Sequence, residues 1–270
     1  MAVYYEAKAL RDLGRSAASA RGMRIVAAGG GRLAPAARRG LAHLARLAGD
    51  FPTALDVART LGWEGRHHRV EGDVLWLQGD IDAAAAAYGA ARDEAEQHGI
   101  AGERATSQTH RAFVLAFTDP GLADDEIDLA HQLLTGLDLR ATGFTLELAE
   151  LTRDAGHIPV ADFGARVEVL RTRMRVAGLA ATQEPTLDLV VTFQQAVAGA
   201  YRDAAGTINR LGALTSGGDY AYYTDIAYFM IDRALDHRTR TRWIDGEPAT
   251  RQRWHDLVTS RRARRSGQPV

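Results

Sequence analysis

The stretch EGRHHRVEGD, residues 64–73, places two histidines among carboxylates. His67 and Glu71 are four residues apart, so a helix would set an imidazole and a carboxylate one turn apart, a spacing suited to two metal ligands. Zinc sites need three or four ligands, and helical His–Glu pairs are common on solvated faces. We therefore expect no metal site and no cofactor.

Other catalytic patterns are missing from the sequence. It contains no HExxH, no GxSxG and no cysteine, and so no Cys–His nucleophile. Lys8 is the only lysine and has no P-loop context, while the glycines of AAGGGRLAP (residues 27–35) lack the P-loop order and indicate a flexible connector. We expect the protein not to be an enzyme.

Composition indicates a globular chain. Of 270 residues, 46% are hydrophobic and 25% charged, and the net charge of -1 points to neither nucleic acid nor membrane. The start MAVYYEAKALRDLGR is unlike a signal peptide, and no apolar run approaches the ~20 residues of a membrane span. We expect a cytoplasmic protein. Its near-exclusive use of arginine as the basic residue fits a GC-rich coding sequence.

The elements that must position these residues are helices. After Gly79-Asp80, a turn followed by a helix cap, Ala84, Tyr88, Ala91 and Ala95 fall at i, i+4, i+7 and i+11. This spacing predicts one helical face of small residues with a single aromatic. With a preceding helix over roughly residues 66–78, it predicts two helices joined by a tight turn.

The same pattern returns along the chain. Turn signals recur at Gly14, Gly49-Asp50, TDPGL (118–122), Gly156-His157 and Gly199. The apolar positions that follow them are Ala54, Ala58 and Leu61, then Ala123, Ile127 and Ala130, then Ala161 and Ala165, then Ala204, Ile208 and Leu211. No convincing strand pattern appears, and LDLVVTF (187–193) is interpreted as a buried helix segment. The sequence predicts an all-α fold.

The unit from Gly65 to His98 resembles a tetratricopeptide repeat (TPR). It carries Gly72, Gly79-Asp80, Ala84, Tyr88 and Ala91 at the positions that family favours. It departs from the family at His68, where a Trp is usual, at Glu71, where a Leu is usual, and in lacking a closing Pro.

A longer resemblance rests on RHHRVEGDVLWLQGDIDAAAAAYGAARDEAEQHG, ADDEIDLAHQLLTGLDLR and GDYAYYTDIAYFM. These segments are similar to the C-terminal helical-repeat tails of bacterial STAND-type NTPase regulators. The resemblance implies a right-handed superhelix of six or seven helix pairs over residues 1–270, with a break at the 28–35 loop. It also implies a sensor or scaffold, either excised from a larger protein or a stand-alone relative.

The resemblance to TPR also implies a binding groove. In that family the first helix of each pair lines a concave groove, and certain positions of that helix point into it. In this sequence the corresponding positions are Tyr4, Lys8, Arg11, Arg39, His43, Arg46, Arg66, Arg69, Asp73 and Trp76. Arginine forks grip carboxylates or phosphates, and aromatic side chains add apolar contact. The groove would bind an acidic peptide, an acidic protein surface or a phosphorylated ligand. The alternative is a set of solvated faces in an arginine-rich protein.

Two C-terminal segments are further candidates. Tyr222 and Phe229 share one helical face of the aromatic segment GDYAYYTDIAYFM, and Tyr223 lies on a neighbouring face, which indicates core packing or a second binding surface. The basic residues 261–270 are predicted to be a frayed tail, with nucleic-acid binding as the less favoured reading.

Charge is unevenly distributed along the chain. Residues 1–48 carry a formal charge of +7 and residues 71–130 one of -10, which could steer a charged partner. We expect a regulatory interaction module whose partner is a protein or peptide, a parent NTPase domain or a second copy. The alternatives are a stand-alone regulator that senses a peptide or small ligand, and an all-α enzyme whose acidic residues meet only in three dimensions.

Overall fold

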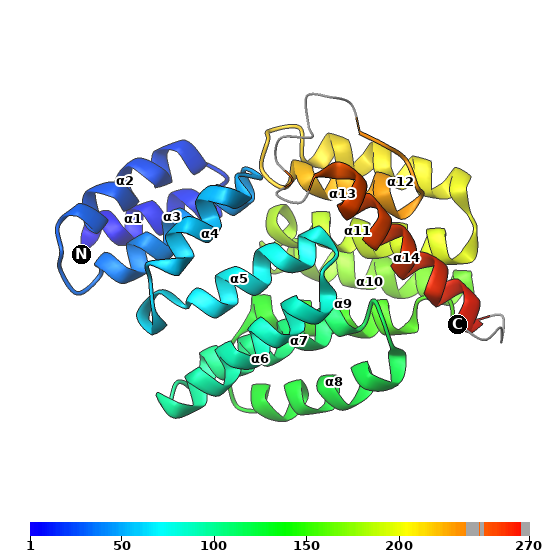
Figure 1. Ribbon diagram of the computed structural model, residues 1–270, viewed down its shortest axis with the longest axis horizontal. Helices are drawn as coiled ribbons and strands as arrows, with labels where there is room; N and C mark the ends of the chain where they lie inside the picture. The colour runs from blue at the N-terminus through cyan, green and yellow to red at the C-terminus, as the bar shows by residue number, and fades with distance from the viewer. Residues whose placement is uncertain (236–242, 244–245, 266–270) are drawn as a thin grey trace.

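A computed structural model describes residues 1–235, 243 and 246–265, and within these residues every regular element is a helix (Figure 1). The expected all-α class is confirmed for this part of the chain. None of its helices is long and apolar enough to cross a membrane. The α-helices are α1 (Ala2–Asp12), α2 (Ser16–Ala28), α3 (Ala34–Leu47), α4 (Phe51–Arg59), α5 (His67–Leu75), α6 (Ile81–Gln97), α7 (Ala101–Leu115), α8 (Pro120–Leu134), α9 (Arg140–Asp154), α10 (Val160–Val176), α11 (Ala180–Ala198), α12 (Tyr201–Leu214), α13 (Ala221–Met230) and α14 (Glu247–Arg265). Short 3-10 helices are η1 (Trp63–Gly65) and η2 (Trp76–Gln78).

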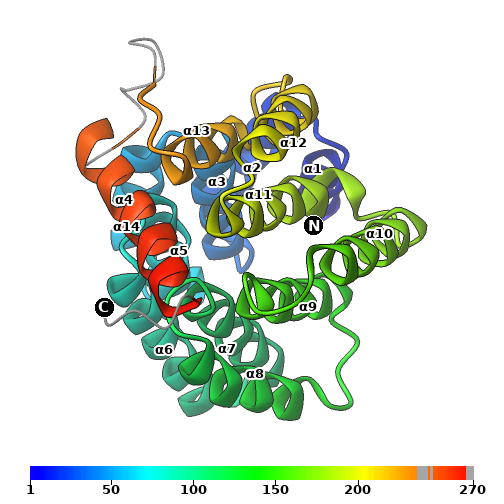
Figure 2. The ribbon, with the colours of Figure 1, turned by 90° about the vertical axis from the view of Figure 1, so that its right-hand side faces the viewer.

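Consecutive helices pack against one another, as α1 does with α2, α3 with α4, α5 with α6 and α7 with α8. The first helix of each later pair also packs against the first helix of the next pair, α7 against α9, α9 against α11 and α11 against α13. Figure 2 shows these helices following a curved course, so that the last of them return beside α4 and α5. Helices distant in sequence thereby come to face one interior.

Aspartates begin the second helix of several pairs, as the turn signals predict. Asp50 and Asp80 accept hydrogen bonds from the backbone N–H groups of Thr53 (3.2 Å) and Ala83 (3.3 Å). Each bond satisfies one of the N–H groups that a helix start leaves free. Gly79 before the second cap has φ +74°, a conformation that strains any residue with a side chain.

The helix expected over roughly residues 66–78 is present as α5 followed directly by η2. Arg66 adopts a left-handed conformation with φ 58° between η1 and α5, and the last turn tightens into η2. The helix thus begins at His67, one residue after the expected start, because the left-handed Arg66 cannot belong to a right-handed helix.

The repeated apolar positions are buried in most units. Ala84, Tyr88, Ala91 and Ala95 are 0–4% exposed. The predicted positions after Gly49, TDPGL and Gly199 are buried as well. The unit after Gly156 differs, because Ala161 and Ala165 are exposed while Phe163 and Val167 are buried. There α10 begins only after Pro159, so the prediction chose the wrong face of this helix.

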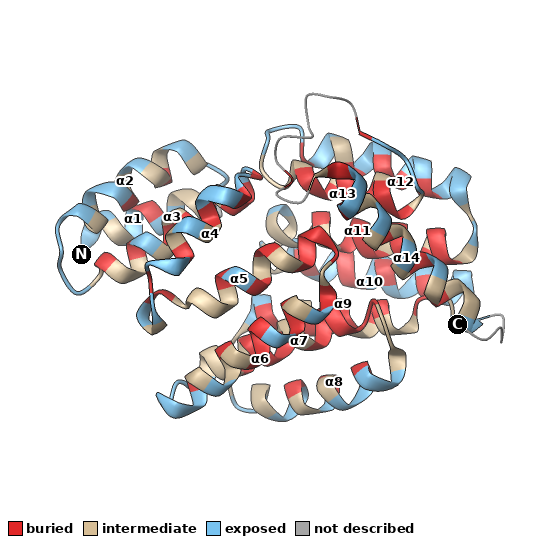
Figure 3. Cartoon of the chain, in the orientation of Figure 1, coloured by how far each residue is buried: buried red, intermediate tan, exposed pale blue. Residues whose placement is uncertain are grey.

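A large core runs from α4 to α14, and a smaller one joins the first three helices (Figure 3). In the smaller core Met23 of α2 lies so close to Gly40 of α3 that an added Cβ would stand 2.9 Å from its sulfur. Both residues belong to helices that flank the glycine-rich loop at 28–35. That loop therefore does not divide the core.

The C-terminal helix α14 is an integral part of the fold. Trp254 is fully buried, and its Nε1 donates to the carbonyl of Leu77 (3.0 Å). Arg261 is 1% exposed and donates to the carbonyls of Thr152 and Ala155 at the end of α9. The frayed tail predicted over 261–270 is thus wrong for 261–265, because unpaired carbonyls at a helix end attract these cations. Residues 266–270 lie outside the described residues.

The packing of α6 can be tested at Ala84, which is 0% exposed on a helix that packs against both α5 and α7. Ala84→Leu should overpack this contact and lower the free energy of unfolding by about 1–3 kcal/mol. Ala86, exposed on the same helix, supplies the control, and Ala86→Leu should change stability little. Denaturant unfolding of both variants measures the difference, and equal stability of the two would contradict the predicted packing.

Candidate functional site

A cavity of about 650 Å³ lies between eight α-helices, η2 and the turn before α13. Its charged lining residues are Arg11, Arg46, Arg69, Asp73 and Asp219, and its histidines are His43 and His110. Trp76, Phe113, Tyr220 and Tyr223 supply aromatic surface, and Thr106, Thr142, Thr145, Thr182 and Thr186 supply hydroxyl groups. The volume is within the range of small-molecule sites.

Six of the ten predicted groove residues line this cavity: Arg11, His43, Arg46, Arg69, Asp73 and Trp76. Tyr4, Lys8, Arg39 and Arg66 do not. Only the last turns of α1 and α3 reach the cavity, so residues one or two turns earlier on the same face lie beyond it. Lys8 is exposed there. The family offsets choose the correct helical face but not where along the helix the cavity ends.

Arg46 is the most buried cation of the cavity, with 8% exposure. One terminal nitrogen donates to the hydroxyl of Tyr222 (3.1 Å) and the other lies 3.2 Å from Nδ1 of His43. Its Nε stands 3.7 Å from Asp73 Oδ2. Burial opposes the charge, but Tyr222 and Asp73 outweigh it and raise the pKa of Arg46. The guanidinium therefore stays charged.

Asp73 faces Arg46 from α5 and is held on its other side by Tyr88. The Tyr88 hydroxyl donates to Asp73 Oδ1 (2.8 Å), and the ring has room because Gly72 presents no side chain to it. Burial, and then Asp73, raises the pKa of Tyr88 well above its usual value, so the phenol keeps its proton. Asp73 is thus held by a hydrogen bond from Tyr88 on one side and by the charge of Arg46 on the other.

A second group of charges stands where α5 meets α7. Arg69 Nε and Arg66 Nε lie 2.5 Å and 3.2 Å from the two carboxylate oxygens of Glu103. Arg66 also covers the Trp63 ring, 3.8 Å from its centroid. Burial, and then the charge of Arg69, lowers the pKa of Arg39. Arg39 therefore lies within electrostatic range of the Arg66, Arg69 and Glu103 group. Glu103 thus pairs with Arg66 and Arg69 and also lies within electrostatic range of Arg39, so three positive charges surround this one carboxylate.

The two histidines of the cavity are neutral near pH 7. Burial, followed by the charges of Arg46 and Arg11, holds the pKa of His43 well below its usual 6.5. Burial also lowers the pKa of His110, against a smaller opposing effect of Asp73. His110 Nδ1 lies 2.8 Å from the carbonyl of Thr106, which sets Nδ1 as the donor and leaves Nε2 as the acceptor.

The aromatic candidate residues divide between the cavity and the core. Tyr223 lines the cavity, 5.9 Å from Trp76 between ring centroids. Tyr222 lies behind it, packed 5.4 Å from Phe51, and holds Arg46. Phe229 is fully buried against Trp243 (5.2 Å), in the core. The same segment thus supplies both core packing and part of the candidate site.

Several lining residues were not predicted. Thr106, His110 and Phe113 on α7, and Thr142 and Thr145 on α9, stand three or four residues apart on one helical face. Applying the groove offsets to these later helices could have found them. Asp219 and Tyr220 come from a turn and carry no such spacing.

Comparisons of the chain with models of protein families, with curated proteins and with solved structures give no match.

The neutral state of His43 predicts a pH dependence of stability. Its pKa is lowered in the folded protein, so on acidification through about pH 6.5 the unfolded chain takes up a proton first, and stability falls. In His43→Gln the amide oxygen can still accept from Arg46, but nothing titrates. Between pH 7.5 and pH 5 this variant should lose less free energy of unfolding than the parent protein. The difference between the two should be at most about 1.4 kcal/mol per pH unit. Parallel stability curves from denaturant titrations would contradict the assignment.

Proposed function

We propose that the chain is a non-catalytic sensing or interaction module of a bacterial signalling protein, and that its central cavity binds an acidic ligand. The proposal includes a right-handed TPR-like superhelix of helix pairs, and it is supported by the first helices of successive pairs, which line the cavity. The observation that carries the proposal is the convergence of Arg11, Arg46 and Arg69, from three different helices, on one cavity of about 650 Å³.

Two helix starts support an anionic ligand. The first turns of α9 and α11 line the cavity through Ala141, Thr142, Ala181 and Thr182. Neither helix has a side-chain cap, whereas α4, α6 and α8 are capped by aspartates. Uncapped N–H groups and the positive end of the helix dipole attract anions.

The size of the cavity favours a small ligand or the acidic end of a peptide. Carboxylate and phosphate groups share the chemistry that arginine forks and helix N-termini bind. Trp76, Phe113, Tyr220 and Tyr223 would contact an apolar or planar part of the same molecule. In a signalling protein of the cytoplasm, such a module would report the ligand to a parent NTPase domain, a second copy or another protein.

The ligand proposal is tested at Arg69, because its partner Glu103 keeps an ion pair with Arg66 when Arg69 is changed. A panel of inorganic phosphate, dicarboxylates and nucleotides is screened by thermal shift, and ligands that bind are measured by calorimetry. Arg69→Gln should weaken binding by about tenfold or more, a loss of roughly 1.4 kcal/mol, and added salt should also weaken it.

The matched control is Arg38→Gln, which removes an exposed charge from α3 that does not line the cavity. Equal weakening by both variants would assign the effect to overall charge and would count against the cavity. So would a ligand whose affinity is unchanged by Arg69→Gln.

An all-α enzyme is the second candidate, favoured by the two neutral histidines that share the cavity with Asp73. The carboxylates of the cavity are already engaged, Asp73 with Tyr88 and Asp219 with Ser16 (2.5 Å). This engagement supports binding over acid–base catalysis.

The purified chain should not hydrolyse ATP or GTP, because Lys8 is its only lysine and has no P-loop context. Release of phosphate is measured against a protein-free blank, with and without Mg²⁺. Turnover that is lost in His43→Gln or in a His110→Gln variant would replace the binding proposal with the enzymatic one.

A further inference from the structure

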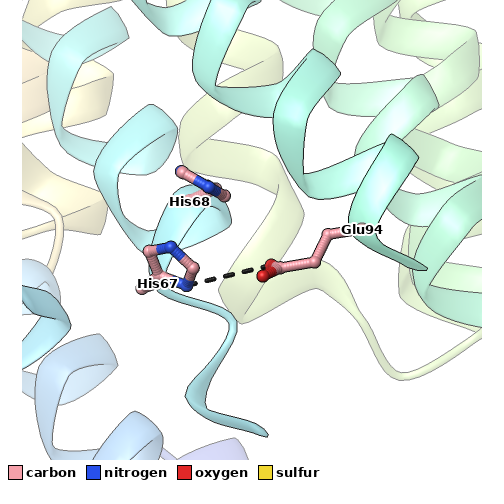
Figure 4. Close-up of side chains that lie close together, drawn as sticks. All are labelled: His67, His68 and Glu94. Carbon is pink, nitrogen blue, oxygen red and sulfur yellow. Dashed lines mark ion pairs between the residues drawn. The ribbon is translucent and has the colours of Figure 1, made fainter. Parts of the chain in front are cut away.

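Three residues with metal-ligating side chains meet outside the central cavity. His67 and His68 begin α5, and Glu94 reaches toward them from α6 (Figure 4). One ligand atom from each lies within 4.8 Å of the others. Glu71, one helical turn from His67, is not a member of this group. The carboxylate of the group comes instead from Glu94 on the neighbouring helix α6.

Two observations distinguish this group from a chance surface cluster. The Nδ1 of His67 is buried and has no hydrogen-bond partner, although Glu94 Oε2 stands 3.8 Å away. The rings of His67 and His68 lie close together, with centroids 3.8 Å apart and ring planes inclined by 37°. A buried, unpaired ring nitrogen is costly in an apoprotein, and a metal ion would satisfy it.

The distances suit a small ion with few ligands. Zinc binds nitrogen and oxygen ligands at about 2.0–2.2 Å, so tetrahedral ligand atoms stand roughly 3.3–3.6 Å apart. The ligand atoms lie within 4.8 Å of one another, so their separations need to contract by at most about 1.5 Å, which rotation of partly exposed side chains provides. The side chains of His67, His68 and Glu94 are 28%, 34% and 24% exposed, so an ion can reach them from solvent.

The surroundings are compatible with a cation. His68 Nδ1 lies 3.7 Å from Glu71 Oε2, so a second carboxylate is at hand to orient this ring. Arg66, the cation that directly precedes His67 in the sequence, has its guanidinium over the Trp63 ring and paired with Glu103. The two carboxylates therefore face the histidines while the arginine is engaged elsewhere.

We propose that His67, His68 and Glu94 bind a divalent transition-metal ion of the zinc type, with water completing the coordination. Two imidazoles and one carboxylate favour Zn²⁺, Co²⁺ or Ni²⁺ over Mg²⁺ and Ca²⁺, which prefer oxygen ligands alone. None of the three residues lines the cavity, so the ion ties α5 to α6 and does not depend on the cavity ligand. This proposal reverses the expectation from sequence that the chain holds no metal.

The test uses the full chain without an affinity tag, stripped with a chelator and titrated with Co²⁺. The visible absorption of Co²⁺ reports coordination by nitrogen and oxygen, and displacement by Zn²⁺ gives the zinc affinity. We expect one ion per chain and a higher melting temperature with zinc. His67→Ala and the near-isosteric Glu94→Gln should each lower the affinity at least about tenfold.

His131→Ala is the matched control. His131 also pairs with a glutamate, Glu150 at 2.8 Å, but the described residues bring no third ligand to that pair. This variant should bind Co²⁺ as the parent does, and circular dichroism checks that every variant is folded. Binding without saturation at one equivalent overturns the proposal, as does an affinity that Glu94→Gln leaves unchanged.

Discussion

The buried charge of Arg46 is the interaction on which the central part of the molecule depends. A guanidinium removed from water is destabilising by several kcal/mol unless its donors and charge are matched. Here the match comes from three places in the chain: His43 one turn away, Asp73 on α5 and Tyr222 on α13. The Tyr220 N–H also donates to the carbonyl of Leu47 beside it (2.9 Å). The first helices and the last are thus joined at the wall of the cavity.

This junction changes the kind of site that the inward-facing arginines can form. An open groove would leave them in water, where charge is screened and long peptides can lie across it. The return of the C-terminal segment places Tyr220 and Tyr223 among the residues that enclose the arginines. In a partly enclosed and partly apolar space, each charge–charge contact is stronger than in open water, which supports the proposal of a short ligand. The geometry is therefore consistent with the proposed binding of a small acidic group.

The arginines of α14 have a structural role. Arg261 donates hydrogen bonds to carbonyls at the end of α9. Arg262 donates to the carbonyls of Ala196 and Val197 at the end of α11. Arg264 pairs with Asp119 at the start of α8 (2.6 Å). A helix end leaves carbonyl groups unsatisfied, and a row of cations along one helix can serve several such ends at once. A basic segment that could bind phosphates instead binds the backbone of its own fold.

The sequence by itself determined what depends on neighbours along the chain. The spacing of Ala84, Tyr88 and Ala91 predicted a buried helical face, and Asp50 and Asp80 predicted helix starts, because both follow from backbone periodicity and local hydrogen bonds. The face of α3 that carries His43 and Arg46 was predicted for the same reason. Only the tertiary structure decided how far along each helix the cavity extends, which is why Lys8 lies outside it. It also decided that Arg261 is buried and that Glu94 joins the two histidines. Such contacts join residues far apart in sequence, and no local spacing encodes the path by which the chain returns.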